Sequence, residues 1–324
     1  MEGKKTEITV ELGAIPDGPD AYHPAAERGW QENLEEIQRM DRLFGDQIDV
    51  KAIPYEGTKS LLSGGRKGRV AYPELIQCMR FYNREGLPFM VPFNGGLCLE
   101  EGLIDVSEAR FKTEQIVLEA LANSAEKSGQ INVVTVLRDE LREFVRKEYP
   151  NLRIVGSCLR YIGGRKGEFD GEKRMTEDLD LFDEIVPLNQ HTVPQFLSRF
   201  QDRIDQIIAF LCLGCACDGK GEEGFYRCYN HHVEEEFFNQ GRDLDTPLPI
   251  SVEDFDFMGS KLDTLTPECF AEQLENRPED LKEILEMGVR KFKIPRIAIE
   301  KLEVFNAIYQ VRRIIEEGNY GFSG

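Results

Sequence analysis

Long apolar stretches and familiar catalytic motifs are both missing from this sequence. No segment approaches the roughly 18 uninterrupted apolar residues that a helix needs to cross a bilayer, which argues against a membrane protein. The opening residues, MEGKKTEITVELG, lack the apolar stretch of a signal peptide, so we expect a cytoplasmic protein. A Walker loop, a G-x-S-x-G elbow and a Rossmann fingerprint after the first predicted strand are absent as well. Because these motifs are absent, none of them identifies a catalytic residue.

Basic residues are comparatively scarce. The chain has 40 Lys and Arg against 59 Asp and Glu, which gives a formal net charge of −19 over 324 residues. Such a balance opposes non-specific binding to phosphate backbones and argues against a bulk nucleic-acid coat or scaffold, although it permits a local basic pocket. The chain also has eight cysteines. In a reducing cytosol we expect core residues or metal ligands rather than disulfides.

An alternation of strand and helix patterns runs along almost the whole chain. The strand candidates are apolar without strict alternation, as expected for parallel strands covered by helices. Eight strands, each followed by a helix except for one long interruption, predict an α/β fold of the (β/α)8 TIM-type barrel class. An open doubly wound sheet is the alternative. The predicted strands are Ile8–Ile15, Gln47–Tyr55, Pro88–Gly96, Ile131–Asp139, Leu152–Ile162, Glu184–Asn189, Asp205–Cys212 and Val289–Ile299.

The long interruption falls between the seventh and eighth strands, at residues 214–277. No Ser/Pro-rich linker separates it from the rest of the chain. We therefore predict a single barrel domain over residues 1–324, with a βα-loop insertion at 214–277. In a barrel such loops stand at the C-terminal face of the strands, where active sites are built.

Four cysteines crowd into one short segment directly after the seventh apolar run, at Cys212, Cys215, Cys217 and Cys228. Soft sulfur ligands at the end of a strand suit zinc or an iron–sulfur cluster. Their spacing fits neither a zinc finger nor a ferredoxin run, so the pattern predicts a metal or redox site without choosing the metal. Cys269, before the last crossover helix, is the candidate for a distant ligand. Small buried thiols that fill a packed loop are the alternative.

Two identical GGRKG segments, at residues 64–68 and 163–167, follow the second and fifth predicted strands. Such loops could place backbone N–H groups around an anion, together with the side chains of Arg66, Lys67, Arg165 and Lys166. The alternative is a pair of exposed turns in which glycine supplies a positive φ.

The eighth strand adds two further cations, Lys293 and Arg296. If the strand alternates, Lys293 points opposite to its apolar neighbours, while Arg296 lies at or past the C-terminal end. Both could bind an anionic substrate group or neutralise the charge of a cluster, and ion pairs with carboxylates are the alternative. The remaining polar residues at strand ends could line the barrel mouth, but no spacing marks a catalytic base: Glu11, Asn94, Ser157, Asn189 and His191.

The C-terminal third resembles the collagenase-like peptidase family. Glu283–Glu316 is similar to that family's Leu-rich helix, F-K-I-E-G-R motif and closing helix. FLCLGCACDGKGEEGFYRC, at residues 210–228, resembles its cysteine region, and Phe257–Phe270 resembles its S-K-D-L-C stretch.

The family's anaerobic hydroxylation members hold a four-iron, four-sulfur (4Fe-4S) cluster through four cysteines. The resemblance implies Cys212 as the first ligand, Cys217 or Cys215 as the second, Cys228 as the third and Cys269 as the fourth. It further implies an enzyme that hydroxylates or otherwise modifies an RNA base, or a small aromatic or anionic molecule, without oxygen.

Two other functions stay open. The first is a non-catalytic barrel with a zinc-stabilised loop, which would serve as an assembly or partner-binding subunit. The second is peptide hydrolysis, for which the sequence offers no nucleophile–base pair. A protein partner or an oligomer is compatible with each function.

Overall fold

The computed structural model of the chain describes residues 6–13, 30–32, 34–35, 38–39, 42–43, 48–58, 60–62, 71–96, 104–161, 171–188, 192–211, 274, 277–294 and 301–320. The predicted insertion at 214–277 lies outside these ranges except for residues 274 and 277.

In the described ranges, eight strands form one sheet, in which every pairing is parallel. The strands are β1 (Thr6–Gly13), β2 (Ile48–Tyr55), β3 (Met90–Phe93), β4 (Val133–Val136), β5 (Arg153–Gly156), β6 (Glu184–Ile185), β7 (Ile208–Phe210) and β8 (Lys291–Ile294). Their spatial order is β6-β5-β4-β3-β2-β1-β8-β7. A parallel bridge between Ile185 and Ile207 links the two ends of this order. The predicted α/β class with a parallel sheet is confirmed, and each predicted strand overlaps an observed one.

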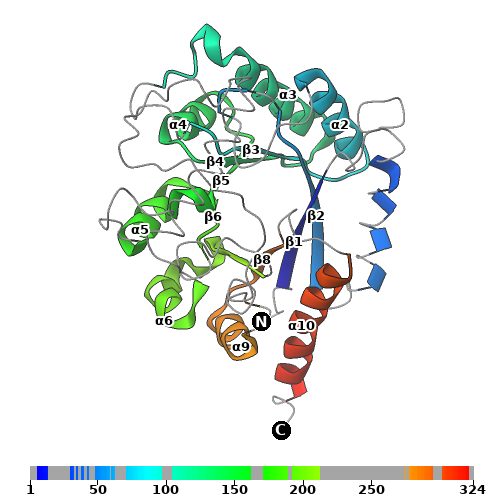
Figure 1. Cartoon of the computed structure of the whole chain (residues 1–324), viewed down its shortest axis with the longest axis vertical. Helices are drawn as coiled ribbons and strands as arrows, with labels where there is room; N and C mark the ends of the chain where they lie inside the picture. The colour runs from blue at the N-terminus through cyan, green and yellow to red at the C-terminus, as the bar shows by residue number, and fades with distance from the viewer. Residues whose placement is uncertain are drawn as a thin grey trace, which may run out of the picture.

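Helices connect the strands and lie around the outside of them (Figure 1). They are α2 (Tyr72–Arg84), α3 (Lys112–Ser128), α4 (Asp139–Glu148), α5 (Gly171–Leu181), α6 (Pro194–Leu197), α9 (Pro278–Met287) and α10 (Lys301–Tyr320). Three short 3₁₀ helices accompany them: η1 (Ala109–Phe111), η2 (Cys158–Tyr161) and η5 (Ser198–Gln206).

Local sequence explains where several helices begin and end. Proline occupies the first turn of α2, α6 and α9, where its missing N–H costs no helical hydrogen bond. Helices α3 and α9 both stop at a left-handed glycine, Gly129 with φ 72° and Gly288 with φ 107°. These caps fix the points at which the chain turns back toward the sheet.

The two faces of the sheet have different surroundings. On one face, strand residues such as Val91, Val134 and Ile154 pack with the helices in one large core. The other face carries a smaller apolar cluster from the strands and their immediate ends: Ile53, Met90, Val133, Val155, Val186, Ile208 and Phe210. It is called the helix-free face below, because none of the described buried residues in this cluster belongs to a helix. Burial on both faces explains why the strand sequences are apolar without clean alternation.

Most of the strands are shorter than the sequence predicts, and the reason is clear for β5, β6 and β7. β5 ends at Gly156 rather than at residue 162, because the following residues form η2, with the Leu159 N–H donating to Ser157 Oγ at 3.2 Å. β6 has only two residues, and Pro187, which has no N–H to donate, follows soon after it. β7 begins at Ile208, since η5 occupies the residues before it.

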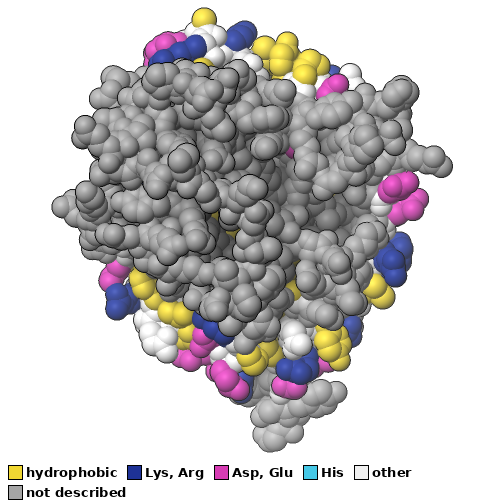
Figure 2. Space-filling model, viewed as in Figure 1, with side chains coloured by type: hydrophobic (Ala, Val, Ile, Leu, Met, Phe, Trp, Pro, Cys, Tyr) yellow, Lys and Arg dark blue, Asp and Glu magenta, His cyan; other side chains and the backbone are white. Residues whose placement is uncertain are grey.

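The charged surface is mixed where the structure describes it. Figure 2 shows Lys and Arg side chains interspersed with Asp and Glu around the margin of the molecule. None of the helices in the described ranges has the length and apolar character that a bilayer span requires.

Candidate functional site

All eight strands run in the same direction, so their C-terminal ends meet at one edge of the sheet, called the carboxyl edge below. In parallel α/β proteins this edge is where ligands bind and catalysis occurs. Two predicted site segments continue from it. Leu211, whose N–H donates to Lys293 O at 2.9 Å, is the residue before Cys212. Tyr161, at the end of η2, precedes the second GGRKG segment by two residues.

Lys293 lies on the helix-free face. Along β8, Phe292 and Ile294 are buried in the large core, while Lys291 and Lys293 line a small cavity of about 20 Å³ on the opposite face. This is the alternation that the sequence predicts for Lys293. Its ammonium lies 5.4 Å from the centroid of the Phe210 ring, a cation–π distance. Binding of an anion by Lys293 stays a prediction.

The opposite end of the helix-free face is closed by an ionic cluster that the sequence analysis missed. Glu184 is 6% exposed and accepts a hydrogen bond from Lys291 Nζ at 2.6 Å. Arg153 Nε lies 3.7 Å from the other carboxylate oxygen. Each of these residues is the first of its strand, so the cluster marks the N-terminal end of the sheet. The cavity above it has room for about one water molecule.

Loops after β2, β3 and β4 are tied to one another at the carboxyl edge. The Gly95 N–H donates to Leu62 O at 2.8 Å. Gly96 has φ 98°, and a Cβ there would lie 3.1 Å from Arg138 Cγ and 3.3 Å from Leu62 Cδ2. The Arg138 guanidinium in turn donates to Glu140 at 3.1 Å. Leu62, which is fully buried, stands two residues before the first GGRKG segment.

A buried carboxylate holds the same Leu62 loop from the other side. Glu114, in the first turn of α3, has no exposed surface, and its Oε1 accepts from the Leu62 N–H at 2.8 Å. Burial raises the pKa of Glu114, an effect that the hydrogen bond from Leu62 only partly offsets. Glu114 therefore anchors the loop at a cost in stability when it is charged.

The loop after β5 is anchored by a buried ion pair. The Arg160 guanidinium donates to both oxygens of Asp178, at 2.8 and 2.7 Å, and both side chains are fully buried. It also donates to Asp139 at 2.9 Å and stacks 4.6 Å from the Phe182 ring centroid. Burial would lower the pKa of Arg160, but the hydrogen bond to Asp178 and the nearby carboxylates outweigh it and raise the pKa. Tyr161 follows this anchor directly.

Most of the predicted site residues lie outside the described ranges. This applies to all predicted metal ligands and to all predicted anion-binding residues except Lys293: Cys212, Cys215, Cys217, Cys228, Cys269, Arg66, Lys67, Arg165, Lys166 and Arg296. Of the other strand-end polar residues, Asn94 directly follows β3 and Ser157 directly follows β5. Within the described part of the chain, no three His, Cys, Asp or Glu side chains gather as metal ligands would.

Two described cysteines do not belong to the predicted metal site. Cys78 is fully buried on α2, and burial together with the charge of Glu56 raises the pKa of its thiol well above the ordinary value. A thiol in such surroundings stays protonated and is a poor metal ligand. Cys158 is a half-buried cysteine in η2 that packs against both apolar clusters.

Comparison with known proteins adds no relative: neither a protein-family model nor a curated protein matches the chain.

Proposed function

We propose that the chain is an iron–sulfur enzyme built on a closed (β/α)8 barrel, which modifies a small anionic or aromatic substrate without oxygen. The reaction is a hydroxylation or a related modification. The observation that carries the proposal is that Lys293 and three residues that closely precede the predicted site segments all lie toward the carboxyl edge of one parallel sheet. Leu211 directly precedes Cys212, and Leu62 and Tyr161 each stand two residues before a GGRKG segment.

Two observations support closure of the sheet into a barrel. The bridge between Ile185 and Ile207 joins β6 to the start of β7, the two ends of the strand order. The small cavity is lined by side chains from every strand between β2 and β8, including Ile53, Val155 and Lys293. Side chains of seven strands around one small space are expected in the filled interior of a barrel, not on an open sheet.

The donor chemistry fits an iron–sulfur cluster. Cys212, Cys217 (or Cys215), Cys228 and Cys269 would hold it, since four thiolates with long, irregular spacing suit a cluster better than the paired knuckles of structural zinc. When bound, the cluster supplies one-electron redox chemistry. The same cysteines carry the resemblance to the anaerobic members of the collagenase-like peptidase family, and that resemblance is therefore part of the proposal.

Charge on the helix-free face favours an anionic substrate. The described ionic side chains that line its cavity are Arg153, Lys291 and Lys293 against the single carboxylate of Glu184. Glu184 contacts Arg153 and Lys291 at the N-terminal end of the sheet. Lys293, two residues closer to the carboxyl edge, is placed to attract an anion that enters from that edge. Because the cavity below holds only about one water, the substrate binds above it.

A small substrate is favoured over RNA. The chain carries a net charge of −19, and its described surface mixes both signs, so an extended phosphodiester would meet repulsion outside the site. A cytoplasmic location belongs to the same proposal, because a reducing compartment keeps the eight cysteines available as thiolates.

The test is the metal content of protein purified without oxygen. We expect brown protein with a broad visible absorption band, and iron and sulfide near four per chain, as for one 4Fe-4S cluster. Cys228→Ser should lose the band, while Cys78→Ala, which removes a buried thiol from α2, should keep it. Colourless protein with stoichiometric zinc would instead support the non-catalytic barrel. Retained iron in Cys228→Ser would refute the ligand set.

A further inference from the structure

A basic groove lies between α2 and α3, outside the sheet. Its volume is about 410 Å³, within the range of roughly 300–1,000 Å³ typical of ligand pockets. Three cations line it, Arg80 and Arg84 from α2 and Lys127 from α3, and none of the described residues that line it is a carboxylate. In a chain with 59 acidic and 40 basic residues, a groove without an acidic side chain calls for an explanation.

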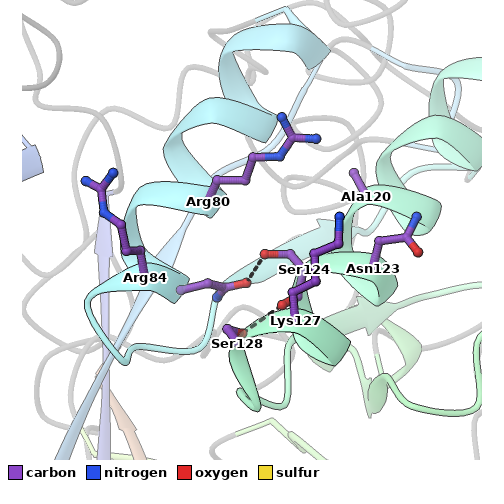
Figure 3. A pocket seen from close by; sticks show the side chains of 8 residues that line it. Arg80, Arg84, Ala120, Asn123, Ser124, Lys127 and Ser128 are labelled. Carbon is purple, nitrogen blue, oxygen red and sulfur yellow. Dashed lines mark hydrogen bonds between the residues drawn. The ribbon is translucent and has the colours of Figure 1, made fainter.

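Two of the cations have no acidic partner in the part of the chain that the structure describes. Most described arginines form an ion pair, but neither Arg80 nor Lys127 forms an ion pair or hydrogen bond with any residue in the described ranges. Figure 3 shows Arg80 extending from α2 toward α3 and Lys127 rising from the facing side, whereas Arg84 points away from α3. Arg84 already lies beside Glu85 and over the Phe81 ring. Arg80 and Lys127 are therefore the two cations of the groove that are available to bind a ligand.

The floor of the groove is rigid and its polar groups are satisfied. The Ser124 hydroxyl donates to Asn83 Oδ1 at 2.6 Å, and the Asn83 amide donates to Asn132 Oδ1 at 2.8 Å. The Asn132 amide returns a bond to Asn83 Oδ1 at 2.9 Å. Since Asn132 immediately precedes β4, this network fixes the groove at the N-terminal end of the sheet, away from the carboxyl edge.

Helix dipoles account for two of the three cations but not for Arg80. A cation in the last turn of a helix interacts favourably with the negative C-terminal end, which explains Arg84 and Lys127. Arg80 lies a full turn earlier, where that interaction has largely faded. Moreover, Arg80 and Arg84 are four residues apart on one helix, a like-charge spacing that weakens the helix. An anion held between Arg80 and Lys127 would offset the mutual repulsion of the cations that line the groove.

We propose that the groove between α2 and α3 binds the phosphate-type oxyanion of a small molecule, through Arg80 and Lys127. Arginine and lysine are the usual side-chain donors to such groups. The other side of α3 argues against a nucleic-acid strand as the ligand. There a second groove is lined by Glu119, Glu126 and Glu148, and no cation stands among its described lining residues. This groove would repel a phosphodiester chain that continued past the site.

Calorimetric titration of the full-length protein with inorganic pyrophosphate at low ionic strength tests the proposal. We expect saturable binding that weakens about tenfold or more in Arg80→Glu and in Lys127→Glu, because each removes a charge-assisted contact. Lys112→Glu, at the other end of α3, changes the net charge equally and should bind as the wild type does. All three side chains are exposed, so thermal unfolding should confirm that each variant folds.

Several results would overturn the proposal: no binding by the wild-type protein, binding that survives both groove variants, or equal weakening in Lys112→Glu. A short single-stranded RNA that binds through Arg80 and Lys127 without competition from pyrophosphate would overturn the small-molecule assignment. The groove is independent of the proposed iron–sulfur site. Cys228→Ser should therefore leave pyrophosphate binding unchanged even where it abolishes the visible absorption band.

Discussion

The most severe single defect that we expect in the described fold is Asp178→Asn. Asp178 accepts two hydrogen bonds from Arg160, at 2.8 and 2.7 Å, and neither side chain has any exposed surface. Asparagine keeps one acceptor oxygen and nearly the same volume but removes the charge. Among the described residues, Asp139, which is 43% exposed, would then be the only charged partner of Arg160 within bonding distance. Removal of one partner from a buried pair typically costs about 3–5 kcal/mol.

Urea unfolding measures this loss as a shift in the transition midpoint. A matched control lies two residues away on the same helix: Asp180 pairs with Arg203 at 2.7 Å but is 66% exposed. Asp180→Asn should therefore cost less than about 1 kcal/mol. A combined replacement of Arg160 by Met and Asp178 by Leu should recover much of the loss, since no buried charge remains. If Asp178→Asn costs no more than Asp180→Asn, the pair does not anchor the loop after β5.

Two further predictions concern the loops after β2 and β3. Gly96→Ala should destabilise the protein by about 1–3 kcal/mol more than Gly86→Ala in urea unfolding, because both have positive φ but only Gly96 would also bring a Cβ into contact; equal losses would contradict the close contact. The raised pKa of Glu114 means that the folded protein holds this proton to a higher pH than the unfolded chain does. Stability should therefore fall as the pH rises from the ordinary value of about 4.5 through the raised pKa, and Glu114→Gln should remove that fall, whereas the exposed Glu119→Gln should not. A pH profile that Glu114→Gln leaves unchanged would exclude Glu114 as its source.

The existence of all eight strands could be predicted from the sequence, because each is an apolar run bounded by helical periodicity or turn residues. Their lengths could not be predicted as well. The apolar run that begins at Glu184 looks like six residues of strand, but only two form ladder pairs before Pro187 removes a donor. The run after Arg153 looks continuous through residue 162, but the burial of Arg160 against Asp178 turns the chain into η2. Contacts across the fold, not local propensity, decide these ends.

In the candidate site, too, some features could be predicted from the sequence and others could not. The orientation of Lys293 follows from the two-residue period of a strand and could be predicted. The ionic cluster of Glu184, Lys291 and Arg153 could not be, because Glu184 and Lys291 are 107 residues apart in the sequence and meet only when β8 and β6 share one face. A charged residue at the start of each of three apolar strands was the available signal. On its own, that pattern is equally typical of a solvated strand end.

The described residues that precede the two GGRKG segments share a feature that connects stability to the proposed function. Each begins two residues after a fully buried side chain, Leu62 in one case and Tyr161 in the other. Each of these is held near a buried ionisable group, Glu114 or the Arg160–Asp178 pair, although a well-packed apolar contact would hold a loop at lower cost. Such costs in stability are expected where the position of the backbone matters for function. Hydrogen bonds and ion pairs fix the orientation of a loop as well as its distance from the core. If the proposed function is right, loss of the Asp178 charge should weaken the substrate binding that we propose at the carboxyl edge, even at temperatures where the protein remains folded.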